Sequence, residues 1–265
     1  MPNLSLSEIT LYFEQDGAGE PLLLIAGIAS DSASWLPLIP HLSGNFSLIR
    51  PDNRSTGRTI PPDAPTDLHR NAADCVALLD HLGVEKAHVL GHSMGGLVAM
   101  ELATACPDRV GSLTLAAIAP LRSARNVALF DALIAIRRSN APPDTWLRAF
   151  FPWLFAPPMF NDPAAIDAAV QMALAYPFAQ PVEGMERQLR ALDSYDPTHL
   201  DIRTPVQALL GGYDILMPEG PARDALARID GIDIKTIATA AHSVHWDAPQ
   251  IVADHIRAFA AQHPL

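Results

Sequence analysis

A serine with a glycine two residues away on each side, in the sequence Gly-His-Ser-Met-Gly, occupies positions 91–95. A short apolar run, Ala87–Leu90, precedes it, and strong helix formers follow over Leu97–Ala105. A Gly-x-Ser-x-Gly turn between a strand and a helix is typical of a nucleophile elbow, in which backbone strain pushes the serine hydroxyl outward. The helix after such a turn directs its N-terminal N–H groups toward an oxyanion. The spacing therefore predicts that Ser93 is a nucleophile.

A serine nucleophile needs a base to remove its proton and an acid to orient that base. In folds with this turn, the acid and then the base follow the serine along the chain. Asp214 is the candidate acid, because Gly211–Asp214 forms the loop at the end of a buried strand expected over Val206–Leu210. Taken alone, Asp214 also fits a turn residue or a helix cap, and Ser93 upstream favours the catalytic interpretation.

Two of the ten histidines lie in the loop expected after the last strand, His242 and His245. His242 directly follows the end of that strand and precedes a helix that Asp247 is expected to cap, so we assign the base to His242. His245 remains the alternative base, and otherwise a residue of the pocket mouth. His92 lies inside the serine turn, too close to the backbone of Ser93 to direct its ring at the hydroxyl.

An oxyanion hole requires two N–H donors that converge on one point. We expect the first from Met94, directly after Ser93, and the second from Ile28, in the loop that follows the apolar run Leu22–Ile25. Trp35, further along this loop, is expected either to pack in the core or to line the substrate pocket. The sequence has no His, Cys, Asp and Glu cluster with metal-ligand spacing, so neither a metal nor an organic cofactor is expected.

The elements that position these residues alternate between strand and helix. Strands are expected over Leu4–Phe13, Leu22–Ile25, Phe46–Arg50, Ala87–Leu90, Val110–Ile118, Pro205–Leu210 and Ile232–Ile237, and helices over Leu68–Leu82 (capped by Thr66 or Asp67), Leu97–Ala105, after Pro218, and over Ala248–Ala261. Continuous apolar runs such as Leu22–Ile25 are typical of strands buried on both faces of a parallel sheet. The order predicts a doubly wound, mostly parallel α/β sheet.

Residues 121–195 interrupt this alternation with helical periodicity alone. Helices are expected over Asn126–Arg138, from Pro142 to about Phe155, from Pro163, and over Glu183–Leu192. We therefore predict an α/β core of residues 1–120 and 196–265, with a helical cap of residues 121–195 inserted after the strand that ends near Ile118. Such an insertion lies over the carboxyl edge of the sheet, where ligands bind.

The predicted cap is rich in aromatic residues. Trp146 and Trp153 are its tryptophans, and several phenylalanines lie beside them in the sequence. Most aromatic residues of a helical segment pack between helices, but some of these are expected to line an apolar pocket over the site.

The composition excludes several classes of protein. The net charge of −11 disfavours a nucleic-acid partner, and no apolar stretch reaches the length of a membrane span. The N-terminal residues lack the pattern of a secretion signal, and Cys75 and Cys106 are expected to be reduced, so a cytoplasmic location is expected. A small molecule is the expected partner, and the sequence does not indicate the oligomeric state.

With these residues in place, the chain resembles the α/β-hydrolase superfamily over essentially its full length, and within it small esterases such as 3-oxoadipate enol-lactonases and anthracycline methyl esterases. Four segments carry the resemblance: Leu23–Gly27, Asp52–Arg58, the serine turn, and Gly211–Asp214 together with His242–Pro249. The spacing from His242 to Asp247 and Pro249 is similar to the family's pattern and favours His242 as the base. The family usually has His where Ala26 stands, and a second glycine at Ser55 or Thr56.

The resemblance implies an α/β-hydrolase fold and a serine hydrolase that cleaves a carboxylic ester or a lactone through an acyl-enzyme intermediate on Ser93. Serine at the turn disfavours dehalogenase and epoxide hydrolase chemistry, which in this superfamily uses aspartate there. Two alternatives remain: a C–C bond hydrolase or lyase with the same three residues, or a non-catalytic ligand sensor on a hydrolase scaffold.

Overall fold

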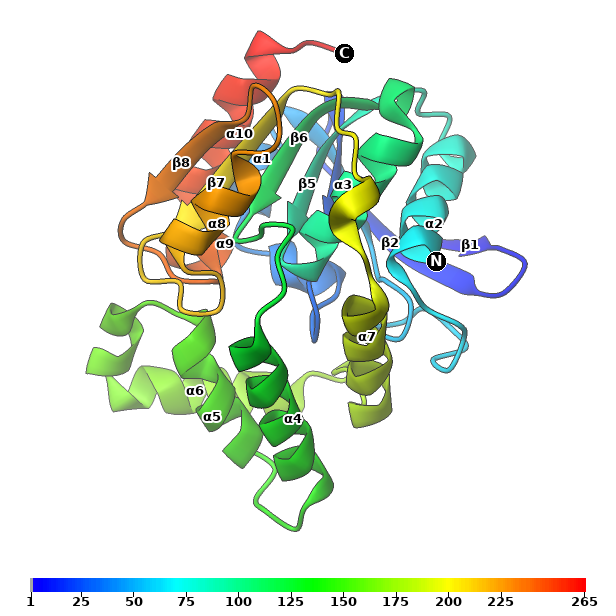
Figure 1. Cartoon of the computed structure of the whole chain (residues 1–265). Coiled ribbons are helices and arrows are strands. Elements are labelled where there is room, and N and C mark those ends of the chain that lie inside the picture. Colours follow the sequence, from blue (N-terminus) through cyan, green and yellow to red (C-terminus); the bar gives the residue numbers. More distant parts are fainter. Residues whose placement is uncertain (1) are drawn as a thin grey trace.

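The structure, a computed structural model, describes residues 2–265, and a mixed sheet forms its centre (Figure 1). Within the described residues the sheet has eight strands in the order β1-β2-β4-β3-β5-β6-β7-β8. The strands are β1 (Asn3–Ser5), β2 (Thr10–Asp16), β3 (Glu20–Ile25), β4 (Phe46–Pro51), β5 (Ala87–His92), β6 (Val110–Ala116), β7 (Val206–Gly211) and β8 (Asp233–Ile237). The pairs from β4 to β8 are parallel, while β2 runs antiparallel to β1 and β4. The predicted doubly wound, mostly parallel sheet is confirmed.

The first predicted strand is divided in two. Instead of one strand over Leu4–Phe13, β1 and β2 pair as an antiparallel hairpin in which Leu4 lies opposite Leu11. The Leu6 N–H donates to the Ile9 carbonyl over 2.8 Å and closes the turn between the two strands. The apolar positions change phase across this turn, from Leu4 and Leu6 to Ile9, Leu11 and Phe13, and the break lies at the polar pair Ser7 and Glu8.

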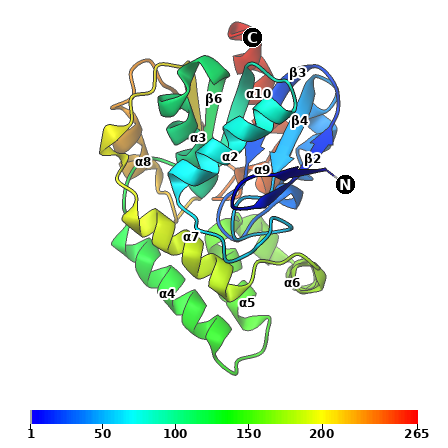
Figure 2. The same cartoon turned by 90° about the vertical axis from the view of Figure 1, so that its right-hand side faces the viewer.

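Helices cover both faces of the sheet (Figure 2), and the side chains of the central strands alternate between two cores, one on each face. Leu23 and Ile25 of β3 belong to the core under α2 (Leu68–His81), α3 (Met94–Ala105) and α8 (Glu219–Leu226). Leu22 and Leu24 belong to the opposite core, under α1 (Ile39–Leu42) and α10 (Pro249–Gln262). A strand covered on both faces needs an unbroken apolar run, which explains the sequence of β3.

Of the two predicted helix N-caps, the one at α2 is confirmed and the one at α10 is wrong. Asp67, and not Thr66, caps α2, because its carboxylate accepts the Arg70 N–H over 2.7 Å. Asp247 does not cap α10, whose N-cap residue is Ala248. Asp247 instead ends a short helix, α9 (Val244–Asp247), and its carboxylate turns toward two backbone N–H groups elsewhere.

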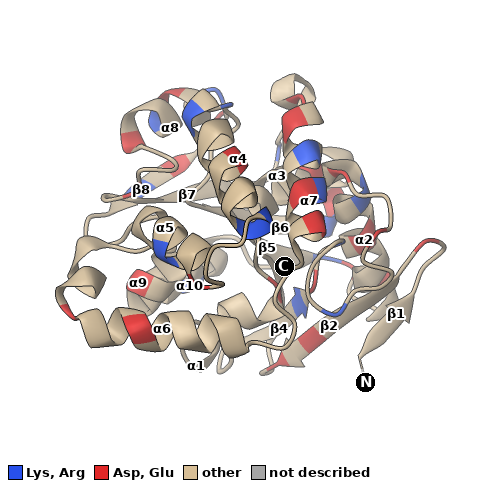
Figure 3. Cartoon of the chain, turned by 90° about the horizontal axis from the view of Figure 1, so that it is seen from below, with Lys and Arg blue, Asp and Glu red and all other residues tan. Residues whose placement is uncertain are grey.

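The chain between β6 and β7 forms α4 (Ala124–Arg138), α5 (Thr145–Leu154), α6 (Pro163–Ala175) and α7 (Val182–Ser194). These helices lie together below the carboxyl edge of the sheet (Figure 1). A small core of Leu147, Phe151 and Val170 joins α5 to α6, whereas Leu133 of α4 and Met185 of α7 belong to the main core. Seen from below, α5 and α6 carry few charged residues, whereas α7 carries both signs (Figure 3). Among the described residues, no helix combines the length and the apolar character needed to cross a membrane.

Candidate active site

Ser93 occupies a strained turn between β5 and α3. Its backbone angles are φ 52° and ψ −126°, in the left-handed half of the map that residues with a side chain rarely adopt. A Cβ added to Gly91 would lie 2.4 Å from the Gly95 carbonyl oxygen, and one added to Gly95 would lie 2.1 Å from the Ile25 carbonyl oxygen. The two glycines therefore let strand, turn and helix approach more closely than any other residue permits.

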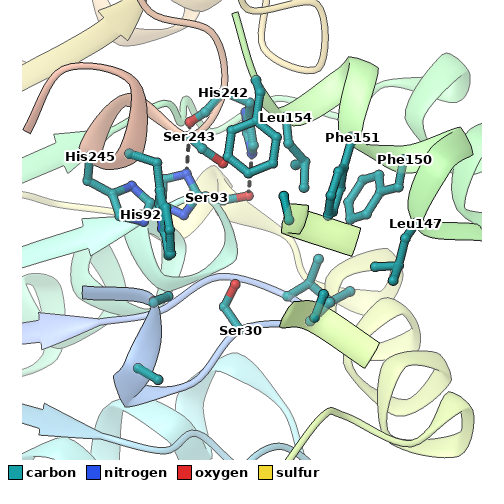
Figure 4. Close-up of a pocket in the computed structure, with 18 of the residues that line it drawn as sticks. Ser30, His92, Ser93, Leu147, Phe150, Phe151, Leu154, His242, Ser243 and His245 are labelled. Carbon is teal, nitrogen blue, oxygen red and sulfur yellow. Dashed lines mark hydrogen bonds between the residues drawn. The ribbon is translucent and has the colours of Figure 1, made fainter. Parts of the chain in front are cut away.

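The three residues expected to act together lie in one chain of hydrogen bonds. The Nε2 atom of His242 is 3.0 Å from the Ser93 hydroxyl oxygen (Figure 4), and its Nδ1 atom is 2.9 Å from Oδ2 of Asp214. The other oxygen of Asp214 accepts the N–H groups of Leu216 and Met217, both over 2.8 Å. The loop after β7 thus fixes the carboxylate, and the carboxylate fixes the imidazole.

This order of partners determines where the imidazole proton lies. A carboxylate only accepts hydrogen bonds, so Nδ1 of His242 carries the proton that faces Asp214. Nε2 of His242 then presents its lone pair to the O–H of Ser93. A neutral imidazole in this orientation can remove the hydroxyl proton as the oxygen attacks an electrophile.

Two further histidines pack behind His242. The Nε2–H group of His92 donates to the His242 carbonyl over 2.9 Å, and the rings of His92 and His245 are 4.5 Å apart. Burial, reinforced by the neighbouring histidines, lowers the pKa of His92 to about 3 and that of His245 well below its ordinary value. Both rings therefore stay neutral, and the hydrogen bond from His92 supports the loop of the candidate base. His242, not His245, lies within hydrogen-bond distance of the Ser93 hydroxyl.

The two expected oxyanion donors lie on the elements that flank Ser93. Met94 is the first residue of α3, so its N–H is one of the helix's free donors. Among the described residues, no backbone hydrogen bond outside helices and strands uses the Ile28 N–H. A Cβ on Gly27 would lie 3.0 Å from Cβ of Ser93, so glycine allows this loop to pass close to the nucleophile.

A cavity of about 800 Å³ opens over Ser93 and His242. Its wall is mostly apolar and comes largely from α4, α5 and α6 of the insertion, with Phe130, Trp146, Leu147, Phe150, Phe151, Leu154, Phe155, Met159, Met172 and Ala173 among its members. Figure 4 shows Phe150, Phe151 and Leu154 on one side of Ser93, with His245 on the other. Trp146 and His245 thus lie where the sequence predicts, on the cavity wall.

The other two predicted wall residues lie elsewhere. Trp35 is fully buried in the core between β3 and α10, where it stacks 4.8 Å from the ring of His245 rather than lining the cavity. Trp153 packs against the main core and lies 5.5 Å from the guanidinium of Arg125 on α4. Composition alone did not distinguish the aromatic residues that face the cavity from those that join helices to each other.

One part of the cavity wall is polar, which no pattern in the sequence indicates. Asp31 accepts the hydroxyl of Tyr176 over 2.7 Å and the Ala33 N–H over 2.9 Å. Burial, together with the nearby charge of Asp52, raises the pKa of Asp31. This contact joins the loop after β3 to the end of α6, from the opposite side of the cavity.

A second contact that the sequence did not reveal joins the loop of His242 to the insertion. The carboxylate of Asp247 accepts the N–H of Ala241 over 2.8 Å and the N–H of Ala156 over 3.1 Å. The Ser243 N–H also donates to the Leu154 carbonyl over 2.8 Å. The chain at the end of α5, at Leu154 and Ala156, and the residues flanking His242 are therefore held by one set of hydrogen bonds.

Three features agree with the resemblance to the α/β-hydrolase superfamily: the order of the strands, the strained turn at Ser93, and the hydrogen bonds from Ser93 through His242 to Asp214. A sequence model of the alpha/beta hydrolase family matches residues 22–255. The chain belongs to this family.

The proteins to which the chain is similar carry the names of different activities. The chain is 28% identical over 267 residues to RutD of Azorhizobium caulinodans, a protein named as a carbamate hydrolase, with 99% of each chain covered. It is 31% identical over 262 residues to the dihydrolipoyllysine-residue acetyltransferase component of an acetoin cleaving system of Pseudomonas putida, covering 95% of this chain and 66% of that protein. A thermophilic esterase from Thermogutta terrifontis superposes with a TM-score of 0.82 at 27% identity, covering 97% and 95% of the two chains.

Proposed function

We propose that this hydrolase is a serine hydrolase that cleaves a carboxylic ester or a lactone through an acyl-enzyme intermediate on Ser93. The observation that carries the proposal is the hydrogen-bonded chain from Ser93 through His242 to Asp214 at the floor of an apolar cavity. Similarity to the Thermogutta terrifontis esterase supports an ester as the substrate.

In the proposed reaction, Nε2 of His242 takes the hydroxyl proton as Oγ of Ser93 attacks the carbonyl carbon. The N–H groups of Met94 and Ile28 hold the oxyanion that forms. The imidazolium returns its proton to the departing alkoxide, and Asp214 stabilises its charge meanwhile. His242 then activates a water molecule, which attacks the acyl-enzyme and releases the acid with free Ser93.

We propose that residues 1–120 and 196–265 form the α/β-hydrolase core and that residues 121–195 form a helical cap over it. The apolar side chains of α5 and α6 favour a substrate with a sizeable hydrophobic acyl or ring group, because burying such a group contributes about 25 cal/mol per Å². A cytoplasmic location is part of the proposal, because both Cys75 and Cys106 are free thiols.

A carbamate is the second candidate substrate. It is favoured by the likeness to RutD over nearly the whole of both chains, and its carbonyl would be attacked in the same way. The apolar cavity wall gives less support to C–C bond cleavage of a charged substrate. The complete chain of Ser93, His242 and Asp214 gives less support to a ligand sensor, which does not need all three residues.

The test is hydrolysis of p-nitrophenyl esters from acetate to decanoate, with a lactone and an aryl carbamate, by wild type and Ser93→Ala. We expect ester or lactone turnover that Ser93→Ala abolishes. Ser34→Ala is the matched control, because Ser34 lines the same cavity outside the hydrogen-bonded chain, and it should keep its activity. Preference for the carbamate would select the second candidate. A folded wild type that turns over none of the three classes would overturn the proposal.

A further inference from the structure

A buried carboxylate outside the cavity lies between two histidines. Glu101 of α3 is 6% exposed, and its Oε1 atom lies 2.6 Å from Nδ1 of His69 on α2. Its Oε2 atom lies 2.7 Å from Nε2 of His199, in the 3-10 helix η4 (Pro197–His199), and accepts the hydroxyl of Tyr195 over 3.0 Å. One ligand atom from each of Glu101, His69 and His199 lies within 4.8 Å of the other two.

The carboxylate of Glu101 is paired with histidines. Among the ion pairs of the described residues, its partners are His69 and His199 rather than a lysine or an arginine. A buried carboxylate is costly unless a cation or several donors compensate it. Among the described residues this carboxylate therefore has no permanently charged partner, and it can accept a metal cation.

The tautomer of His199 also indicates that a cation belongs between this ring and Glu101. Its Nδ1 atom lies 2.7 Å from the Asp196 carbonyl oxygen, which only accepts, so Nδ1 carries a proton. In the neutral ring, Nε2 then presents a lone pair to a carboxylate oxygen of Glu101 that also has only lone pairs. Two acceptors at this distance need a positive atom between them, either a proton or a metal ion.

We propose that His69, Glu101 and His199 form a binding site for a divalent transition-metal ion of the Zn²⁺ class. Two imidazole nitrogens and a carboxylate are a preferred donor set for Zn²⁺, with bonds of about 2.0–2.2 Å. The bond from His199 to the Asp196 carbonyl is the type of contact that orients a metal-bound histidine from behind. Tyr195 keeps one oxygen of Glu101 in place, and a fourth position remains for water.

The surroundings permit an ion to enter. The side chain of His69 is 61% exposed and that of His199 is 41% exposed, while Glu101 is buried at the base of the site. Around an ion the nitrogen–oxygen separations have to widen to about 3.3 Å, as tetrahedral bonds of that length require. Exposed imidazoles can make this adjustment by rotating, without a change in the core.

An ion at this site would connect three distant parts of the chain. His69 belongs to α2, Glu101 to the helix that starts at Met94, and His199 to the segment that returns from α7 to the sheet (Figure 1). Residues 69 and 199 are 32 and 98 positions from Glu101, so sequence spacing alone does not reveal the site. We expect the bound ion to fasten the returning segment to α2 and α3 and to raise the stability of the fold.

The test is isothermal titration calorimetry of the metal-free full chain with Zn²⁺ at about pH 7.5, where protons compete weakly for the imidazoles. We expect one ion per chain, and a loss of affinity of at least about 100-fold in the double variant His69→Ala/His199→Ala. His81→Ala is the matched control, because His81 is an exposed histidine of the same helix α2, and it should bind Zn²⁺ as wild type does. Both substituted histidines of the double variant are exposed, so it should fold.

Two further measurements distinguish a specific metal site from nonspecific binding of ions to the protein surface. Zn²⁺ should raise the Tm of the wild type but not that of the double variant. Co²⁺ should give the wild type the visible absorption of a four- or five-coordinate ion, which Glu101→Gln should weaken. Equal Zn²⁺ affinity of the wild type and the double variant, or no saturable binding by the folded wild type, would overturn the proposal. Neither readout depends on hydrolase activity.

Discussion

The carboxylate of Asp247 accepts the backbone N–H of Ala156, at the end of α5, while also accepting the N–H of Ala241 beside His242. One side chain thus spans the insertion and the loop that carries the candidate base. The bond from the Ser243 N–H to the Leu154 carbonyl joins the same two segments. The placement of His242 therefore depends on where α5 ends.

Asp247→Ala should weaken both activity and stability. Losing a charged acceptor for two N–H groups should cost about 2 kcal/mol in the free energy of unfolding. A small displacement of His242 should lower kcat by roughly 10-fold or more. Asp247→Asn, which keeps one acceptor oxygen, should fall between. Urea unfolding and ester kinetics measure the two effects, and Asp224→Ala, an exposed acid on α8, is the control that should change neither.

Asp214→Asn should impair catalysis far more than folding. The amide keeps the shape and one oxygen, but it can no longer stabilise the imidazolium of His242, and it allows the wrong tautomer. We expect kcat to fall by about 10³–10⁴. Circular dichroism and the Tm should stay close to wild type. A folded Asp214→Asn variant with full activity would show that the acid lies elsewhere.

The features that the sequence predicts correctly are those determined by residues adjacent in the chain. The glycines on each side of Ser93 indicate the tight turn in which that residue is strained, and the buried run Leu22–Ile25 indicates a strand covered on both faces. Such signals depend on neighbouring residues alone. Asp214 can be predicted as the candidate acid because the strand and the loop that place it adjoin it in the chain.

The remaining features depend on contacts between distant segments. The bonds from Asp247 to Ala156 and from Tyr176 to Asp31 span 91 and 145 positions, and each aspartate also fits a local cap. Trp35 illustrates the same point, because only packing against α10 distinguishes a core tryptophan from a pocket wall. These contacts have no periodicity that a single sequence displays.

Acid should destabilise the protein through its buried histidines. Burial lowers the pKa of His92 from 6.5 to about 3, so its contribution to stability is present above 6.5 and is lost as the pH falls, because the unfolded chain takes up a proton that the folded chain does not. Between neutral pH and about pH 5, wild type should lose about 2 kcal/mol more than His92→Gln. Urea unfolding at both pH values measures this difference, and His81→Gln should lose as much as wild type.

Two glycine substitutions should have opposite effects. A methyl group at Gly95 would meet the Ile25 carbonyl oxygen at 2.1 Å, so Gly95→Ala should lower the free energy of unfolding by about 3 kcal/mol or more and reduce activity. Gly220, in the first turn of α8, has nothing within 4 Å of an added Cβ. Gly220→Ala should leave stability unchanged or raise it by up to about 1 kcal/mol. Equal Tm values for the two variants would contradict the close approach at Gly95.

Filling the cavity from the insertion should shift the preferred substrate. Ala173 of α6 lines the cavity, whereas Ala175 of the same helix is exposed and lies outside the cavity wall. Ala173→Trp should raise KM for the decanoate ester by roughly 10-fold or more while leaving acetate hydrolysis close to wild type, because only the longer chain needs the space that the indole takes. Ala175→Trp should keep the wild-type order of preference. If Ala173→Trp also kept that order, the acyl group would bind outside the space between α5 and α6.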